Sequence, residues 1–118
     1  MEDHLQKAEE RDKQSIFQAE FDKLNAIFSE VEESKQKLVQ GLIYDAAFLY
    51  SENWDLRRMI AQTGSVVTNP KNPLQQKTLP AATQYLKNAN SYAVVIKALN
   101  GVLSKNEIEP DDGMGEYE

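Results

Sequence analysis

The chain has 118 residues, with 13 Lys and Arg against 19 Asp and Glu and no cysteine. This length favours one small domain, and without cysteine neither a disulfide framework nor a thiolate metal site is possible. The longest apolar run is far shorter than a membrane span, and the charged start MEDHLQKAEERDK lacks the apolar segment of a signal peptide. We therefore expect a cytoplasmic protein that contacts no membrane.

The charge is distributed unevenly along the chain. Residues 1–37 carry six Lys and Arg against ten Asp and Glu, residues 38–105 carry seven against three, and residues 106–118 carry none against six. The net charges are −4, +4 and −6. The negative total argues against nucleic acid as a partner, but the basic middle segment keeps such a partner possible.

Apolar spacing predicts two long helices in the first half of the chain. Residues 1–14 alternate in charge, and we expect a frayed, charged N-terminus there. The apolar stripe that follows changes phase near residue 33, where Ser34 is a candidate N-cap for the next helix. No Gly or Pro lies at this point, so a tight bend and an uninterrupted helix both remain possible. The stripe consists of Ile16, Phe17, Phe21, Leu24, Ile27, Phe28 and Val31.

Residues 38–64 are apolar on more than one side of a helix. The chain is too short to cover such a helix alone, so we expect other subunits to supply part of the cover. Gly41 lies inside the pattern and indicates close approach of another backbone. The first face comprises Leu38, Leu42, Ala46, Leu49, Leu56 and Ile60, and the second comprises Val39, Ile43, Ala47, Tyr50, Trp54 and Ala61. The strip expected to face water comprises Gln40, Tyr44, Asp45, Ser51, Glu52 and Asp55. The candidate oligomer interface comprises Gly41, Ile43, Tyr50 and Trp54.

The second half of the chain begins with a stop signal. Gly64 is predicted to be the left-handed cap that ends the long helix. Residues 65–77 are predicted to form a compact loop that includes a short strand, and a small hairpin is an alternative form of this loop. Thr78 as cap and Pro80 in the first turn predict a C-terminal helix that runs to near residue 105.

The predicted fold is therefore all-α: two long helices as a hairpin or a bent pair, a short strand-like loop and a C-terminal helix. We divide the chain into the frayed start at 1–14, a helical oligomerisation core at 15–105 and a disordered acidic tail at 106–118. The tail ends in an aromatic residue and suits docking on a basic partner, exclusion of non-specific nucleic acid, or solubility. Its candidate docking residues are Asp111, Asp112, Glu116 and Tyr117.

No catalytic or metal-binding pattern emerges from the sequence. His4, the single histidine, lies in the charged start, and no Glu-x-x-His pair, phosphate-cradling Gly-rich turn or nucleophile elbow is present. We expect no enzyme activity, no metal and no cofactor.

The basic residues have two possible explanations. Arg57 and Arg58 lie near the end of the long helix, where helix-dipole stabilisation and ion pairs with Asp55 or Glu52 are a simpler explanation than phosphate binding.

The aromatic group Tyr44, Phe48, Tyr50 and Trp54 is more typical of a core or an interface than of ligand stacking.

One long segment, FLYSENWDLRRMIAQTGSVVTNPKNPLQQKTLPAATQYLKNANSYAVVIKALNGVL, resembles the tailed-bacteriophage terminase small subunit. Members of that family have a long helix with an aromatic turn, an Ile-x-x-x-Gly stop, a short strand-like loop, a Lys-Thr-x-Pro helix start and a last helix of the form Tyr-x-x-x-Ile-x-x-Leu. An acidic tail is also common. The corresponding positions are Tyr50 to Trp54, Ile60 to Gly64, Val66 and Val67, Lys77 to Pro80, and Tyr92, Ile96 and Leu99.

The resemblance implies a non-enzymatic homo-oligomeric ring that recognises packaging-site double-stranded DNA. It also implies a large terminase subunit as partner, an ATPase and nuclease that the ring recruits and regulates in the cytoplasm of an infected bacterium. Some relatives carry an N-terminal helix-turn-helix domain, for which residues 1–37 are too short and too acidic. The alternative is a helical protein-interaction adaptor or regulator with no nucleic-acid role. The candidate DNA-binding residues are Lys35, Lys37, Arg57, Arg58, Lys71 and Lys77.

Overall fold

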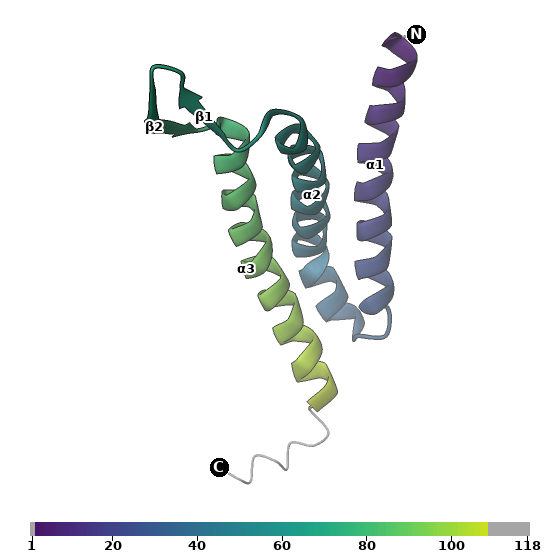
Figure 1. Cartoon of the computed structure of the whole chain (residues 1–118). Coiled ribbons are helices and arrows are strands. Elements are labelled where there is room, and N and C mark those ends of the chain that lie inside the picture. Colours follow the sequence, from purple (N-terminus) through teal and green to yellow (C-terminus); the bar gives the residue numbers. More distant parts are fainter. Residues whose placement is uncertain (1, 109–118) are drawn as a thin grey trace, which may run out of the picture.

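The computed structural model describes the backbone of residues 2–108 and the side chains of residues 12–105. Most of this part is helical, as predicted. Three helices lie side by side, with α2 between α1 and α3, and a two-stranded hairpin projects beyond one end of them (Figure 1). The elements in chain order are α1 (Glu2–Ile27), α2 (Glu33–Thr63), β1 (Val66–Asn69), β2 (Asn72–Thr78) and α3 (Pro80–Ile108).

A turn separates the first two helices, which answers the question that the sequence left open. The turn is held by the side-chain amide of Gln36, which donates to the backbone carbonyls of Ser29 at 3.0 Å and Val31 at 2.6 Å. Our prediction of Ser34 as N-cap is wrong: Glu32 occupies that position without a side-chain capping bond, and Ser34 lies inside α2. Gln36 therefore satisfies carbonyl groups in the turn after α1, which is a different role from that of an N-cap.

The hydrophobic core lies toward the end of the helices where α1 turns into α2. Val39 and Ile43 of α2 are its most deeply buried large side chains. Both belong to the predicted second face, so the chain itself, and not another subunit, covers the beginning of that face. The first face is wrong at Leu38, which is 79% exposed. The core cluster comprises Leu24, Phe28, Val31, Val39, Ile43, Ala46 and Leu99.

The strip of α2 that we expected to face water is partly wrong. Ser51 is only 3% exposed, and it satisfies its hydroxyl by donating to the backbone carbonyl of Phe48 at 2.9 Å. Ser51 lies one turn from Ala47, which is fully buried. Small side chains at these positions leave room for close packing of the neighbouring helix.

α1 begins at Glu2, so helical backbone extends through the segment for which we predicted a frayed start. That fraying stays a prediction. The candidate docking residues Asp111, Asp112, Glu116 and Tyr117 lie outside the described residues.

The end of α2 and the hairpin follow the sequence signals closely. Gly64 ends α2 with a φ of 85°, a value that favours glycine, and its N–H donates to the carbonyl of Ile60 at 2.7 Å. Its ψ of 172° differs from that of the left-handed cap that we predicted. The short strand pairs antiparallel with a second one, so the hairpin form of the loop is the observed one. Thr78 belongs to β2 opposite Val66, so its predicted role as helix cap is wrong, while Pro80 is confirmed as the first residue of α3.

The molecule is elongated and thin. Its radius of gyration is 19.9 Å and its extents are 66 × 40 × 16 Å. A compact chain of this length has a radius of gyration of roughly 13 Å, and one helix with its side chains is about 10 Å thick. Many large apolar side chains therefore remain exposed, namely Ile27, Leu38, Tyr44, Phe48, Tyr50, Met59, Val66, Val67, Leu74, Leu86 and Val94.

Candidate nucleic-acid interface

The six predicted DNA-binding residues fall into two groups at opposite ends of α2. Lys35 and Lys37 lie in its first turns, and Arg57 and Arg58 lie in its last turns, next to the hairpin that carries Lys71 and Lys77. The helical rise separates Lys35 from Arg57 by about 33 Å. The structure therefore does not bring the six into one patch.

The hairpin end has the stronger positive charge. Between residues 56 and 106 the chain has seven Lys and Arg and no Asp or Glu at all. This segment forms the last turns of α2, the hairpin and nearly all of α3. One long edge of the helical layer therefore has basic side chains without intervening acids, and such an edge attracts phosphate groups.

Sequence reasoning missed three members of this acid-free segment, because it considered adjacent and loop positions only. Lys87, Lys97 and Lys105 all lie on α3, and each is exposed. The signal that would have found them is the absence of acids over residues 56–106, which is visible in the sequence itself.

The two arginines have different environments. The guanidinium of Arg58 stacks over the Trp54 ring at 4.9 Å from its centroid and lies 3.9 Å from the Asp55 carboxylate. Arg58 therefore interacts with side chains of its own helix, and the ion pair with Asp55 agrees with the simpler of our two explanations. Arg57 is exposed and is the better candidate for phosphate contact.

Arg57 also lies at an apolar pocket of about 560 Å³ at the base of the hairpin. The pocket joins α2, the two strands and α3, and its apolar walls include Ile60, Val66 and Leu86. A pocket of this size with one arginine at its edge is suited to an apolar side chain that carries a neighbouring acid.

The hairpin itself is an exposed, projecting element. Its residue Leu74 is 92% exposed, and Val67 is half-exposed beside Lys77 of the opposite strand. Two Asx hydrogen bonds stiffen the tip, from the N–H of Lys71 to Asn69 Oδ1 at 2.9 Å and from the N–H of Leu74 to Asn72 Oδ1 at 3.2 Å. A rigid basic ribbon of this kind can enter a groove or add to another subunit.

The four candidate interface residues differ in how much of their surface is exposed. Ile43 is fully buried in the chain's own core, so it offers no surface to a neighbour and our assignment of it was wrong. Gly41 is exposed, and a Cβ at this position would meet nothing within 4 Å outside its own helix backbone. The close contact that it suggested therefore does not occur within the described part of one subunit. Tyr50 is partly exposed, and its ring centroid lies 6.0 Å from that of Tyr92. Trp54 is half-buried, with the Arg58 guanidinium over its ring.

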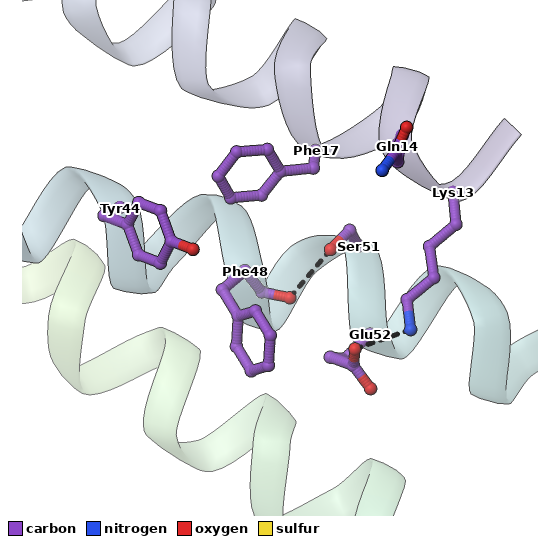
Figure 2. Close-up of a pocket in the computed structure, with 7 residues that line it drawn as sticks. All are labelled: Lys13, Gln14, Phe17, Tyr44, Phe48, Ser51 and Glu52. Atoms are coloured by element: carbon purple, nitrogen blue, oxygen red, sulfur yellow. Dashed lines mark hydrogen bonds and ion pairs between the residues drawn. The ribbon is translucent and has the colours of Figure 1, made fainter. Parts of the chain in front are cut away.

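A second pocket, of about 450 Å³, lies between α1 and α2. Of the predicted aromatic group, Tyr44 and Phe48 line this pocket, whereas Tyr50 and Trp54 do not. Figure 2 shows the Phe17 ring directed toward Tyr44, 5.2 Å away in an edge-to-face arrangement, while Phe48 points away from Phe17. An ion pair of 2.6 Å between Lys13 and Glu52 lies at one side of this pocket (Figure 2). Among its lining residues only this pair is charged, and each charge neutralises the other.

Glu20 is the one buried carboxylate among residues 12–105. It accepts a hydrogen bond of 3.2 Å from the Tyr92 hydroxyl and lies 3.1 Å from the Lys23 ammonium. Burial raises the pKa of Tyr92 to about 12, and the Glu20 charge adds to this effect. The arrangement ties α1 to α3 and is structural, because Lys23 and Tyr92 already occupy the carboxylate.

No cluster of three metal-binding side chains occurs in the part of the chain that the structure describes. Within the same part, no helix combines the length and apolar content needed to cross a bilayer. Comparison with protein-family models, with curated proteins and with solved structures found no match to this chain.

Proposed function

We propose that this chain is a self-assembling, non-enzymatic DNA-packaging adaptor of the terminase small-subunit kind. In this proposal copies of the chain form a ring that binds viral double-stranded DNA and recruits and regulates the large ATPase and nuclease subunit. The observation that carries the proposal is a thin layer of helices whose two long edges have opposite charge.

The thin shape supports self-assembly. A molecule 16 Å thick with many exposed apolar side chains buries too little surface by itself. A second subunit placed against the layer would cover residues such as Phe48, Met59 and Val94, which the chain's own elements leave 46% to 68% exposed. The molecule therefore has the features of one part of a larger assembly.

The charge distribution supports a head-to-tail arrangement. Residues 12–33, on the α1 side, carry six Asp and Glu against two Lys and Arg, whereas residues 56–106 carry seven Lys and Arg and no acid. α2 separates the two edges (Figure 1). If the acidic edge of one copy meets the basic edge of the next, the contact is heterologous and can repeat until a ring closes.

The hairpin end supports DNA binding. Arg57, Lys71 and Lys77 are exposed there. The segment that contains them, residues 56–106, has no Asp or Glu. Contacts of this type bind phosphate and release counterions, so the affinity should fall steeply with added salt.

The test is binding of the purified full chain to duplex DNA at several salt concentrations. The proposal predicts retention of DNA at low salt and a slope of log affinity against log salt that corresponds to several phosphate contacts. Affinity independent of salt, or no binding at low salt by the assembled protein, would overturn the DNA-binding part.

The alternative is a helical adaptor that binds only other proteins. The apolar pocket at the base of the hairpin favours it, since Ile60, Val66 and Leu86 offer an apolar docking site without any nucleic acid. This alternative predicts a dimer or a hetero-complex and no DNA retention, so the same experiment separates the two functions.

A further inference from the structure

A small apolar pocket of about 210 Å³ lies at the opposite end of the layer from the hairpin, between the start of α2 and the end of α3. Leu38, Val39 and Val102 form its walls, and Lys35 and Lys105 form its rim. Its volume suits one apolar side chain. Leu38 is 79% exposed, so this side of the pocket is without cover in the described part of the chain.

Within the described side chains, the two lysines at the rim have no ion-pair partner. No ion pair joins Lys35, Lys37 or Lys105 to any residue between 12 and 105. Long lysine side chains commonly place their methylene groups along an apolar wall and their ammonium groups at its edge. The pocket is therefore suited to a segment that has an apolar side chain with acids beside it.

The chain's own C-terminal segment has this composition and begins beside the pocket. Residues 109–118 read EPDDGMGEYE, with five acids and one methionine between two glycines. α3 ends at Ile108, only six residues beyond Val102. The helical rise makes this gap about 9 Å, whereas the six residues from 109 to 114 span up to about 20 Å when extended.

Met114 cannot reach the other basic end of its own subunit. The pocket at the hairpin includes Leu86, which lies 22 residues before the end of α3. That separation is about 33 Å along the helix, beyond the reach of Met114. Length therefore favours the near pocket within one chain.

We propose that residues 109–118 dock on the pocket of the same subunit, with Met114 between Leu38 and Val102 and with Asp111 and Asp112 at Lys35 and Lys105. In this arrangement the acidic segment covers one basic end of the layer and leaves the hairpin end open. Its consequence for DNA rests on the proposed function: the covered end is closed to phosphate, which directs DNA to the hairpin.

The absence of cysteine allows a direct test by disulfide cross-linking in the full chain. Gly115→Cys places a thiol beside Met114. Ser34→Cys places another on α2 one turn before Leu38, at an exposed position. The matched control is Ser104→Cys with Gly115→Cys, because Ser104 is also an exposed serine near the start of the segment but does not line the pocket.

With oxidised glutathione as oxidant, the Ser34 pair should form an intramolecular disulfide several-fold faster than the Ser104 pair. Adding Lys35→Glu and Lys105→Glu to the Ser34 pair should remove this advantage. Equal rates for the two pairs, a disulfide that joins two copies, or a rate unchanged by the two charge reversals would each overturn the proposal. The result does not depend on DNA, so a failure of the proposed DNA binding would leave this test intact.

Discussion

The Tyr92 hydroxyl of α3 donates a hydrogen bond of 3.2 Å to the buried Glu20 carboxylate of α1. These two helices flank α2 on opposite sides (Figure 1). The Tyr92 ring also lies 6.0 Å from that of Tyr50 on α2, measured between the ring centroids. The bond joins residues 72 positions apart in the sequence. It is therefore a measure of whether the three helices are assembled.

Tyr92→Phe should lower the free energy of unfolding by about 1 to 2 kcal/mol, because Glu20 stays buried and keeps only Lys23. Tyr44→Phe is the matched control, since the Tyr44 ring is 53% exposed, and it should have little effect. Urea unfolding at one fixed protein concentration measures both. Equal stability of the two variants would contradict the role of this hydrogen bond.

The same residue predicts a dependence on pH. The pKa of Tyr92 is raised to about 12 from an ordinary value of 10.0, so the fold favours the protonated hydroxyl. Its contribution to stability is complete below pH 10.0 and is lost as the pH rises toward about 12. The stability difference between the native chain and Tyr92→Phe should therefore shrink over this range. A constant difference from pH 9 to 12 would show that the hydroxyl does not titrate as described.

Ile43→Ala should lower the free energy of unfolding by roughly 2 to 5 kcal/mol, because Ile43 is fully buried at the centre of the core. Leu38→Ala, on the same helix but 79% exposed, should leave the stability of the subunit nearly unchanged. Thermal unfolding followed by circular dichroism measures both. Similar losses for the two variants would contradict the exposed position of Leu38.

Two glycines should respond in opposite directions to alanine. Gly64→Ala should destabilise the chain by about 1 kcal/mol or more, because φ there is 85°. Gly41→Ala should stabilise the isolated subunit by roughly 0.5 to 1 kcal/mol, since Gly41 lies within α2 and a Cβ would meet nothing within 4 Å.

Gly41→Ala also tests whether Gly41 lies at a subunit contact. If another backbone approaches it in the assembly, the variant should stabilise the subunit yet weaken self-association in sedimentation experiments. Unchanged self-association would remove Gly41 from the interface.

Lys71→Ala combined with Lys77→Ala should weaken DNA binding and reduce the slope of log affinity against log salt by about 2, that is, roughly 0.9 for each lost phosphate contact. Lys35→Ala combined with Lys37→Ala is the control with the same charge change at the far end of α2. It should have the smaller effect. The reverse order would place DNA at the start of α2 and not at the hairpin.

Much of the fold was predictable because it depends on local signals. Gly64 ends α2, Pro80 begins α3, and the Asn69-Pro70 dipeptide lies at the turn between the two strands, all as short-range backbone preferences require. Val39 and Ile43 also followed from helical spacing. Each of these features needs only the residue and its near neighbours.

The errors arose where the neighbouring element decides the outcome. Leu38 and Ser51 were assigned to the wrong environment because a helical wheel gives the period of a pattern but not which side another helix covers. Ser34 and Thr78 were plausible caps, yet Glu32 is the N-cap of α2 and Thr78 pairs with Val66 in the hairpin. The division of the basic residues into two ends likewise required the position of the hairpin.

The central claim is that this thin layer is one subunit of a closed, head-to-tail assembly. The mass of the intact native protein, measured at micromolar concentration, tests it most directly. The account predicts a single species whose mass is a multiple of 13.4 kDa and corresponds to a ring of many subunits. A monomer of 13.4 kDa at that concentration would contradict it.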